Sequence, residues 1–250
     1  MAEAEDKDYT IGHNVSFETT HWSVVLAASD TKAPNAQEAL TNLCNAYWYP
    51  IYAYVRRCGY NPHDAQDLTQ EFFARLLRSH YFALADRKRG KFRSFLISSL
   101  KHFLSHEWDK AKAQKRGGGA KIISIDEEEG ENRYKLEPQD NVTADVLFDR
   151  RWALTLLEQV LSKLKTEYEK SGKAKLFNTI ESALTGSEKL PSYTEIGKKL
   201  DMTEGAVKVA VHRLRQRYGE LLREEIANTV SSPEEVEEEL RNLFEALKTG

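Results

Sequence analysis

Apolar residues recur along most of the chain at steps of three and four, which is the spacing of one face of an α-helix. The clearest example lies within residues 193–222, where Ile196 and Leu200 predict a short helix. A longer helix follows, and its predicted buried side consists of Val207, Val211, Leu214 and Tyr218. Residues 201–202 break the pattern between the two helices, and Thr203 is a good N-cap for the second. The sequence therefore predicts two helices joined by a tight turn.

The same periodicity predicts helices on both sides of this pair. They are expected over residues 37–58, 63–77, 92–108, 143–171, 177–184 and 234–247, with a further helix around His21 and Trp22. Pro50 lies inside the aromatic run AYWYPIYAYVRRCGY and predicts a kink or a fresh helix start there. Alternation typical of strands is scarce, and the chain has only six prolines. We therefore expect an all-α fold.

Composition divides these helices into two groups. The stretch between the helices expected over 92–108 and 143–171 is first basic, then glycine-rich and then acidic, which is typical of a flexible linker. We expect a disordered N-terminus over 1–15, a helical domain over 16–112, a linker over 113–142, a second helical domain over 143–231 and an acidic C-terminal helix over 232–250. The fold class is thus two small helical domains joined by a flexible linker.

Charge is strongly segregated along the chain, although the formal net charge is only −3. Every charged residue between Arg87 and Lys101 is basic, whereas eight glutamates follow residue 223 against only Arg241 and Lys248. No apolar stretch approaches the roughly 20 residues of a membrane span, and the polar N-terminus does not resemble a signal peptide. Two cysteines are too few for a disulfide framework. We therefore expect a cytoplasmic protein that does not contact a membrane.

Enzymatic motifs are missing from the sequence. His102 and His106 are four residues apart on a predicted helix, but no cysteine or suitably spaced carboxylate completes a metal site. The run Gly117-Gly118-Gly119 lacks the context of a phosphate-binding loop, and no catalytic triad spacing occurs. We therefore expect no catalytic residues, no cofactor and no metal. The predicted short helix, tight turn and long cationic helix instead form the helix-turn-helix pattern, whose second helix fits a DNA major groove.

Two blocks of the sequence resemble the extracytoplasmic-function sigma factors, the smallest bacterial transcription-initiation factors. The first, YWYPIYAYVRRCGYNPHDAQDLTQEFFARLL followed by GKFRSFLISSLKHFLSHEWDK, is similar to region two of that family. It has an aromatic helix, a D-x-x-Q-E helix and a G-x-F-R-x-F-L segment. The second, PSYTEIGKKLDMTEGAVKVAVHRLRQRYGELL, is similar to region four. The resemblance covers about residues 40–112 and 145–223, and the order and spacing of the blocks make it specific.

The resemblance implies core RNA polymerase and promoter DNA as partners, and it assigns three sets of residues. Those expected to bind polymerase are Asp64, Asp67, Gln70 and Glu71. Those expected on the single-stranded, downstream promoter element are Arg87, Lys88, Arg89, Lys91, Arg93, Lys101, His102 and His106. Those expected on the upstream element are Thr203, Glu204, Lys208, His212, Arg213, Arg215 and Arg217. Exposed carboxylates suit a cationic partner surface, and cations suit phosphates.

The chain also departs from that family in several places. His102 and His106 stand where relatives often have Asn and Asp, and residues 143–190 exceed the usual entry to region four. The acidic tail over 224–250 is an addition, and we hypothesise that it folds over the cationic helix and weakens DNA binding. A plain packing helix is the alternative for that tail.

A second reading of the whole chain is a helix-turn-helix regulator with an N-terminal effector or dimerisation domain. That reading predicts dimers that bind duplex DNA tightly. A sigma factor instead predicts a monomer that copurifies with polymerase, with an anti-sigma factor or another regulator as a further candidate partner.

Overall fold

The computed structural model describes residues 36–78, 91–113, 127–137, 142–185, 191–230 and 232–248. Within these ranges every regular element is a helix, which confirms the all-α prediction for them. The elements are α2 (Ala36–Arg57), α3 (Pro62–Arg78), α4 (Phe92–Ala113), α5 (Glu127–Lys135), α6 (Ala144–Lys170), α7 (Ala174–Ile180), α8 (Ser182–Thr185), α9 (Tyr193–Leu200), α10 (Glu204–Ala227), the 3-10 turn η4 (Pro233–Glu235) and α11 (Val236–Lys248). The expected disordered N-terminus and the helix around His21 and Trp22 lie outside the described residues.

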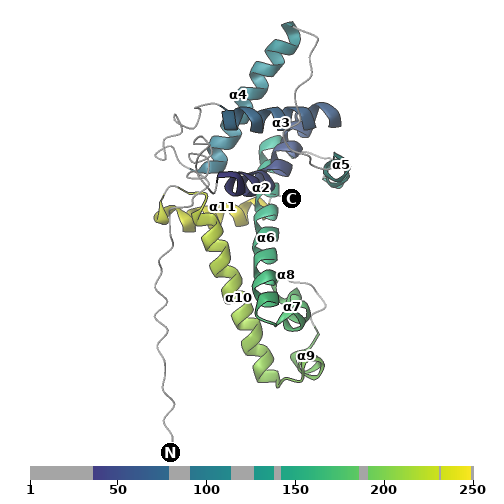
Figure 1. Ribbon diagram of the computed structural model, residues 1–250, viewed down its shortest axis with the longest axis vertical. Helices are drawn as coiled ribbons and strands as arrows, with labels where there is room; N and C mark the ends of the chain where they lie inside the picture. The colour runs from purple at the N-terminus through teal and green to yellow at the C-terminus, as the bar shows by residue number, and fades with distance from the viewer. Residues whose placement is uncertain are drawn as a thin grey trace, which may run out of the picture.

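Helix α6 is the axis of the molecule (Figure 1). Its first half packs against α2, and its second half lies beside α10, while α11 crosses both α6 and the end of α10. The buried side of α6 extends over most of its length and consists of Leu147, Phe148, Trp152, Ala153, Leu156, Val160 and Leu164. These residues belong to one apolar core that also includes side chains of α2, α4 and α10. Helix α6, expected to open a separate second domain, therefore packs against both groups of helices.

Helix α2 is the aromatic centre of the first group of helices. It continues through Pro50 as one helix, and residues 46–55 are all buried because α3, α5 and α6 pack around it. Tyr47 meets the edge of Phe92 on α4 with ring centroids 5.3 Å apart, and Trp48 stacks on Tyr52 at 5.1 Å. Aromatic pairs of this kind add stability beyond the area they bury. The aromatic run is thus a packed core element.

Helix α5 corrects the expectation that residues 113–142 form a flexible linker, at least over 127–137. Glu131 accepts hydrogen bonds from the Tyr52 hydroxyl (2.8 Å) and from Arg56 (3.0 Å). Glu137 is buried and accepts from the Tyr49 hydroxyl at 2.7 Å and from Arg151. Tyrosine hydroxyls in an apolar core need acceptors, and the acidic stretch supplies them. Its carboxylates therefore attach this segment to α2 and α6.

Helices α9 and α10 confirm the predicted pair of helices and tight turn. A capping box joins Ser192 and Glu195 at the start of α9, and Thr203 caps α10 by accepting from the Ala206 amide at 3.2 Å. Asp201 ends α9 in the left-handed conformation, with φ of 55°. Gly197 allows the turn to close, because a Cβ there would lie 2.6 Å from the Met202 carbonyl oxygen. In the part of the chain described, no helix is both long enough and apolar enough to cross a membrane.

Candidate nucleic-acid and polymerase interfaces

An acidic stripe runs along the exposed side of α3. Its carboxylates are Asp64, Asp67 and Glu71, which lie on the solvent side of the helix. Asn61 fixes the first turn by accepting from the Asp64 amide at 2.9 Å and donating to its carboxylate at 2.7 Å. Gln70, predicted to belong to the same surface, is 7% exposed and faces inward instead. Three of the four predicted residues thus form one exposed surface, and the helical phase of Gln70 excludes it.

A pocket between α3 and α4 contains both histidines singled out in the sequence. Its lining consists of Phe72, Arg75, Leu76, Ser99, His102, Phe103 and His106. Phe72 and Phe103 contact each other with ring centroids 5.7 Å apart. Arg75 lies over the Phe103 ring at 5.0 Å and pairs with Glu107 at 2.9 Å. An aromatic wall beside a guanidinium and two imidazoles is suited to a flat, polar-edged group such as a nucleobase.

Arg75 and Trp108 are residues of this region that sequence reasoning did not assign to a site. Arg75 is on α3, and only the packing of α3 on α4 brings it to the histidines. Trp108 follows His106 by two residues on α4 and is 56% exposed. The sequence pattern does not reveal this exposure, because a tryptophan on a helix usually packs into the core.

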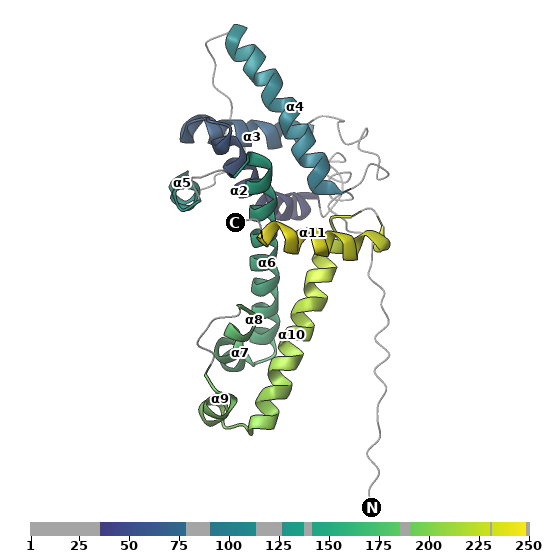
Figure 2. The same ribbon diagram turned by 180° about the vertical axis from the view of Figure 1, so that it is seen from behind.

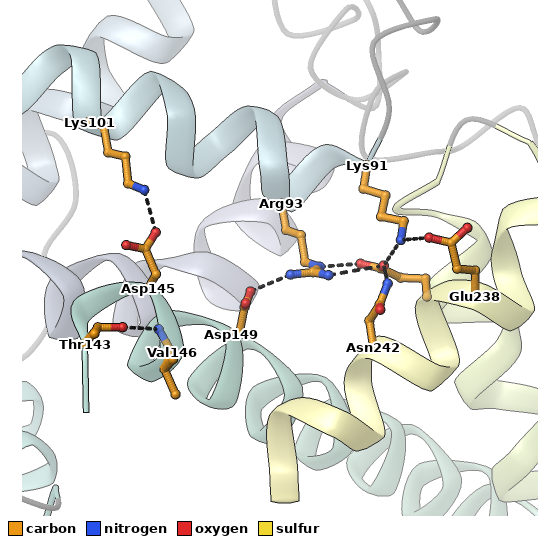
Figure 3. Close-up of polar contacts among 10 residues, drawn as sticks. Lys91, Arg93, Lys101, Thr143, Asp145, Val146, Asp149, Glu238 and Asn242 are labelled. Carbon is orange, nitrogen blue, oxygen red and sulfur yellow. Dashed lines mark hydrogen bonds and ion pairs between the residues drawn. The ribbon is translucent and has the colours of Figure 1, made fainter. Parts of the chain in front are cut away.

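The predicted basic residues at the start of α4 are held by carboxylates from other helices (Figure 3). Lys91 pairs with Glu238 at 2.6 Å and with Glu239 at 3.1 Å, both on α11. Lys101 pairs with Asp145 on α6 at 2.6 Å. Arg87, Lys88 and Arg89 lie outside the described residues. The described cations of this set thus face protein carboxylates.

Arg93 is the most enclosed of these cations. Its guanidinium donates to Glu239 from Nε at 2.5 Å and to Asp149 from Nη1 at 2.5 Å, and it lies 4.9 Å from the centroid of the Trp152 ring. The side chain is 15% exposed, and Glu239 is fully buried. Arg93 therefore joins α4 to α6 and α11, and in this conformation its guanidinium is not presented to solvent.

Two opposing effects set the pKa values in this network. Burial favours the neutral form of each group, and pairing with an opposite charge favours the charged form. Burial raises the pKa of Glu239, but hydrogen bonds from Arg93, Asn242 and Lys91 outweigh it and leave that pKa below the ordinary value. Burial lowers the pKa of Lys91, but its bonds to Glu238 and Glu239 leave it raised. For Asp149 burial prevails over Arg93, and the pKa is raised. Lys91 and Glu239 are accordingly held in their charged forms.

The predicted residues of α10 divide into two groups. Arg215 donates to the Ala183 carbonyl at 3.1 Å, and Arg217 donates to Glu167 at 2.7 Å, so both brace α10 against neighbouring helices. The other predicted residues lie on the exposed side of the first turns: Thr203, Glu204, Lys208, His212 and Arg213. Lys208 pairs with Glu204 within the helix at 2.8 Å. The exposed set therefore surrounds the N-terminal half of α10.

Val209 lies in the middle of that exposed surface, and the sequence reading did not assign it a role. It is 50% exposed, and Gly205 one turn earlier has no atom within 4 Å of the place where its Cβ would be. Glycine at an exposed helical position costs roughly 0.5–1 kcal/mol relative to alanine, and no packing in this structure requires it. The residues at the centre of the outward face of α10 are thus small and apolar.

The acidic tail does not cover this face, contrary to our hypothesis. Helix α10 has 24 residues and is therefore about 36 Å long, and α11 crosses it at its far end (Figure 2). Arg223, near the end of α10, pairs with Glu237 at 3.1 Å. The carboxylates of the tail reach α4 and the last turns of α10, whereas Lys208 and Arg213 remain exposed.

Comparison with known proteins bears on the first group of helices. Residues 44–114 match the family model of sigma-70 region 2. The match includes most of α2 and all of α3 and α4, and so it contains the acidic stripe, the pocket and the cations of α4. No curated protein and no solved structure matches the chain. The match shows that this part of the chain is similar to region 2 of the sigma-70 proteins.

Proposed function

We propose that this protein is a sigma factor of the extracytoplasmic-function type, which binds core RNA polymerase and directs it to promoters. The observation that carries the proposal is the region 2 match over residues 44–114, because the exposed acidic stripe and the aromatic pocket both lie inside it. The exposed face of α10 supplies a second surface. It lies at the opposite end of the long axis from α3 and α4 (Figure 1), as contact with two separate promoter elements would require.

The acidic stripe is the proposed polymerase contact. Asp64, Asp67 and Glu71 are exposed on a rigid helix. They can therefore pair with cations of a partner with little loss of conformational entropy. Each is engaged at most in local contacts, such as His63 with Asp67 at 3.5 Å and Arg75 with Glu71 at 3.1 Å. Such exposed pairs exchange readily because they contribute little to stability.

The pocket between α3 and α4 is the proposed place for an unpaired promoter base. Opening a duplex exposes base faces that stack on aromatic side chains, and the edges of a flipped base accept hydrogen bonds. Arg75, whose guanidinium lies over the Phe103 ring, offers a flat surface for stacking, and His102 and His106 offer the polar edge. Replacement of the family's frequent Asn and Asp by these histidines would then alter which base is preferred.

The N-terminal half of α10 is the proposed reader of the upstream element. Lys208 and Arg213 would contact base edges or phosphates, and one bidentate contact is worth about 1–3 kcal/mol of discrimination. Val209 would contact a thymine methyl group, for which an exposed aliphatic side chain is suited. Gly205 would let the helix backbone approach the groove closely.

Run-off transcription with core polymerase on a pool of promoter fragments tests the proposal. We expect transcripts from a subset of fragments and copurification of the full chain with core polymerase. Asp67→Lys combined with Glu71→Lys should reduce that copurification at least tenfold, whereas the control Glu158→Lys, an exposed carboxylate of α6, should not. Dimers that bind duplex DNA tightly, with no transcript on any fragment, would favour the helix-turn-helix regulator instead.

A further inference from the structure

The cations of α4 are neutralised by carboxylates that come from outside the region 2 match. Asp145 and Asp149 are on α6, and Glu238 and Glu239 are on α11. Figure 3 shows the carboxylates of α6 and α11 lying along the same side of α4 as Lys91, Arg93 and Lys101. The three cations thus face four acids.

Helix α11 is fixed in this position by specific contacts. Glu239 is fully buried and accepts from Arg93, from Lys91 and from Asn242 at 3.0 Å. The Phe92 amide donates to the Thr229 carbonyl at 3.0 Å, which joins the start of α4 to the segment before α11. Leu240 and Leu243 bury the apolar side of α11 in the core. The acidic helix is therefore docked in a defined register.

We propose that α6 and α11 mask the nucleic-acid-binding cations of α4, so that Lys91 and Lys101 engage single-stranded DNA only when their intramolecular carboxylates are displaced. In this arrangement Arg93 is the anchor that positions α11, and the two lysines are the masked contacts. The proposal rests on the function proposed above, because it takes α4 as the surface that meets the melted strand.

The two lysines are suited to exchange. Lys101 and Asp145 are each about half exposed, at 50% and 53%, so water and a competing phosphate can reach them. Glu238 is 58% exposed, although Lys91 itself is only 16% exposed. An exposed ion pair is worth little, so a polyanion that offers several phosphates at once can replace it. Exchange of a carboxylate for a phosphate at these lysines preserves their charge pairing.

A pair of matched double variants tests the masking in the full chain. Asp145→Asn with Glu238→Gln removes the partner of Lys101 and the nearer partner of Lys91. Glu158→Gln with Glu237→Gln removes the same charge from the same two helices, where the carboxylates pair with Arg133 and Arg223. Binding of a fluorescein-labelled 20-nucleotide single strand of mixed sequence is measured by anisotropy at 50 and 200 mM salt.

Each freed cation steepens the salt dependence of single-strand binding by about 0.7 logarithmic units per tenfold change in salt. Two fully freed lysines would raise the affinity ratio between 50 and 200 mM salt by about sevenfold, as the same slope implies. This is the upper limit for D145N/E238Q, because Lys91 keeps its contact with Glu239. We expect this rise for D145N/E238Q and none for the control pair. Lys91→Gln with Lys101→Gln should abolish the gain in the D145N/E238Q background.

Equal salt dependence in the two double variants would overturn the proposal, as would a gain for D145N/E238Q that persists after Lys91 and Lys101 are replaced. Urea unfolding of each variant separates these outcomes from misfolding. The proposed function fails separately: a gain in single-strand affinity without run-off transcripts retains the masking but removes the sigma-factor role. Transcripts with equal salt dependence retain that role and remove the masking.

Discussion

Replacement of Arg93 by methionine decides whether this residue is a structural anchor or a phosphate contact. Methionine keeps much of the aliphatic length but removes the donors to Glu239 and Asp149. Glu239 is fully buried, so the variant leaves its carboxylate without the guanidinium and with the contacts from Lys91 and Asn242. Breaking a buried ion pair by removing one partner costs about 3–5 kcal/mol. Loss of the guanidinium over the Trp152 ring adds to the effect in the same direction.

Urea unfolding followed by circular dichroism measures this cost. At a slope of about 3 kcal/mol per molar urea, the expected loss of stability lowers the urea midpoint by roughly 1–2 M. The matched control is Arg213→Met, an exposed arginine of α10, for which a change within about 0.5 kcal/mol is expected. Arg93→Met combined with Glu239→Met should recover more than half of the loss, because apolar replacement of a buried pair is often close to neutral.

Two results would refute this reasoning. A loss below about 1 kcal/mol for Arg93→Met would mean that Arg93 behaves as an ordinary surface cation. Failure of the second substitution to restore stability would mean that the carboxylate of Glu239 is not the source of the cost.

Three further predictions concern acid stability, the turn and the docked segment. The pKa of Glu239 is lowered, so the stability it contributes is complete above the unfolded glutamate value of about 4.3 and is lost as pH falls through its lower folded pKa. Urea midpoints from pH 7 to pH 3 should fall less steeply for Glu239→Gln, and parallel curves would contradict this. Gly197→Ala should destabilise by about 1–3 kcal/mol in urea, because its Cβ would meet the Met202 carbonyl oxygen, whereas Gly205→Ala should not. Glu137→Ala should lose about 1–3 kcal/mol, because the buried Tyr49 hydroxyl and Arg151 lose their acceptor; unchanged unfolding would argue against docking of this segment.

Local patterns predicted the helices well, because periodicity and capping act over a few residues. The turn between α9 and α10, the cap at Thr203 and the buried side of α10 agree with the sequence prediction. The exposure of the α3 carboxylates also follows from helical phase. Gln70 was expected on the same exposed face, but its position around the helix places it on the buried side. Segment 127–137 differs from the prediction because its polarity is typical of linkers. Its acids accept hydrogen bonds from tyrosines far earlier in the chain, 79 positions before Glu131 and 88 before Glu137.

What the sequence alone determined is therefore the set of helices, their exposed faces and the candidate surfaces that each could present. Only the tertiary structure decided which charges remain available. The sequence pattern indicates an unpaired basic segment that includes Lys91, Arg93 and Lys101. In the structure each of these residues pairs with a carboxylate of α6 or α11 that is more than 40 residues away in the sequence. Such pairing depends on how α6 packs between α2 and α10, because the apolar core sets which charged side chains are brought together. Charge content is a local property of the chain, whereas charge pairing is a property of the fold.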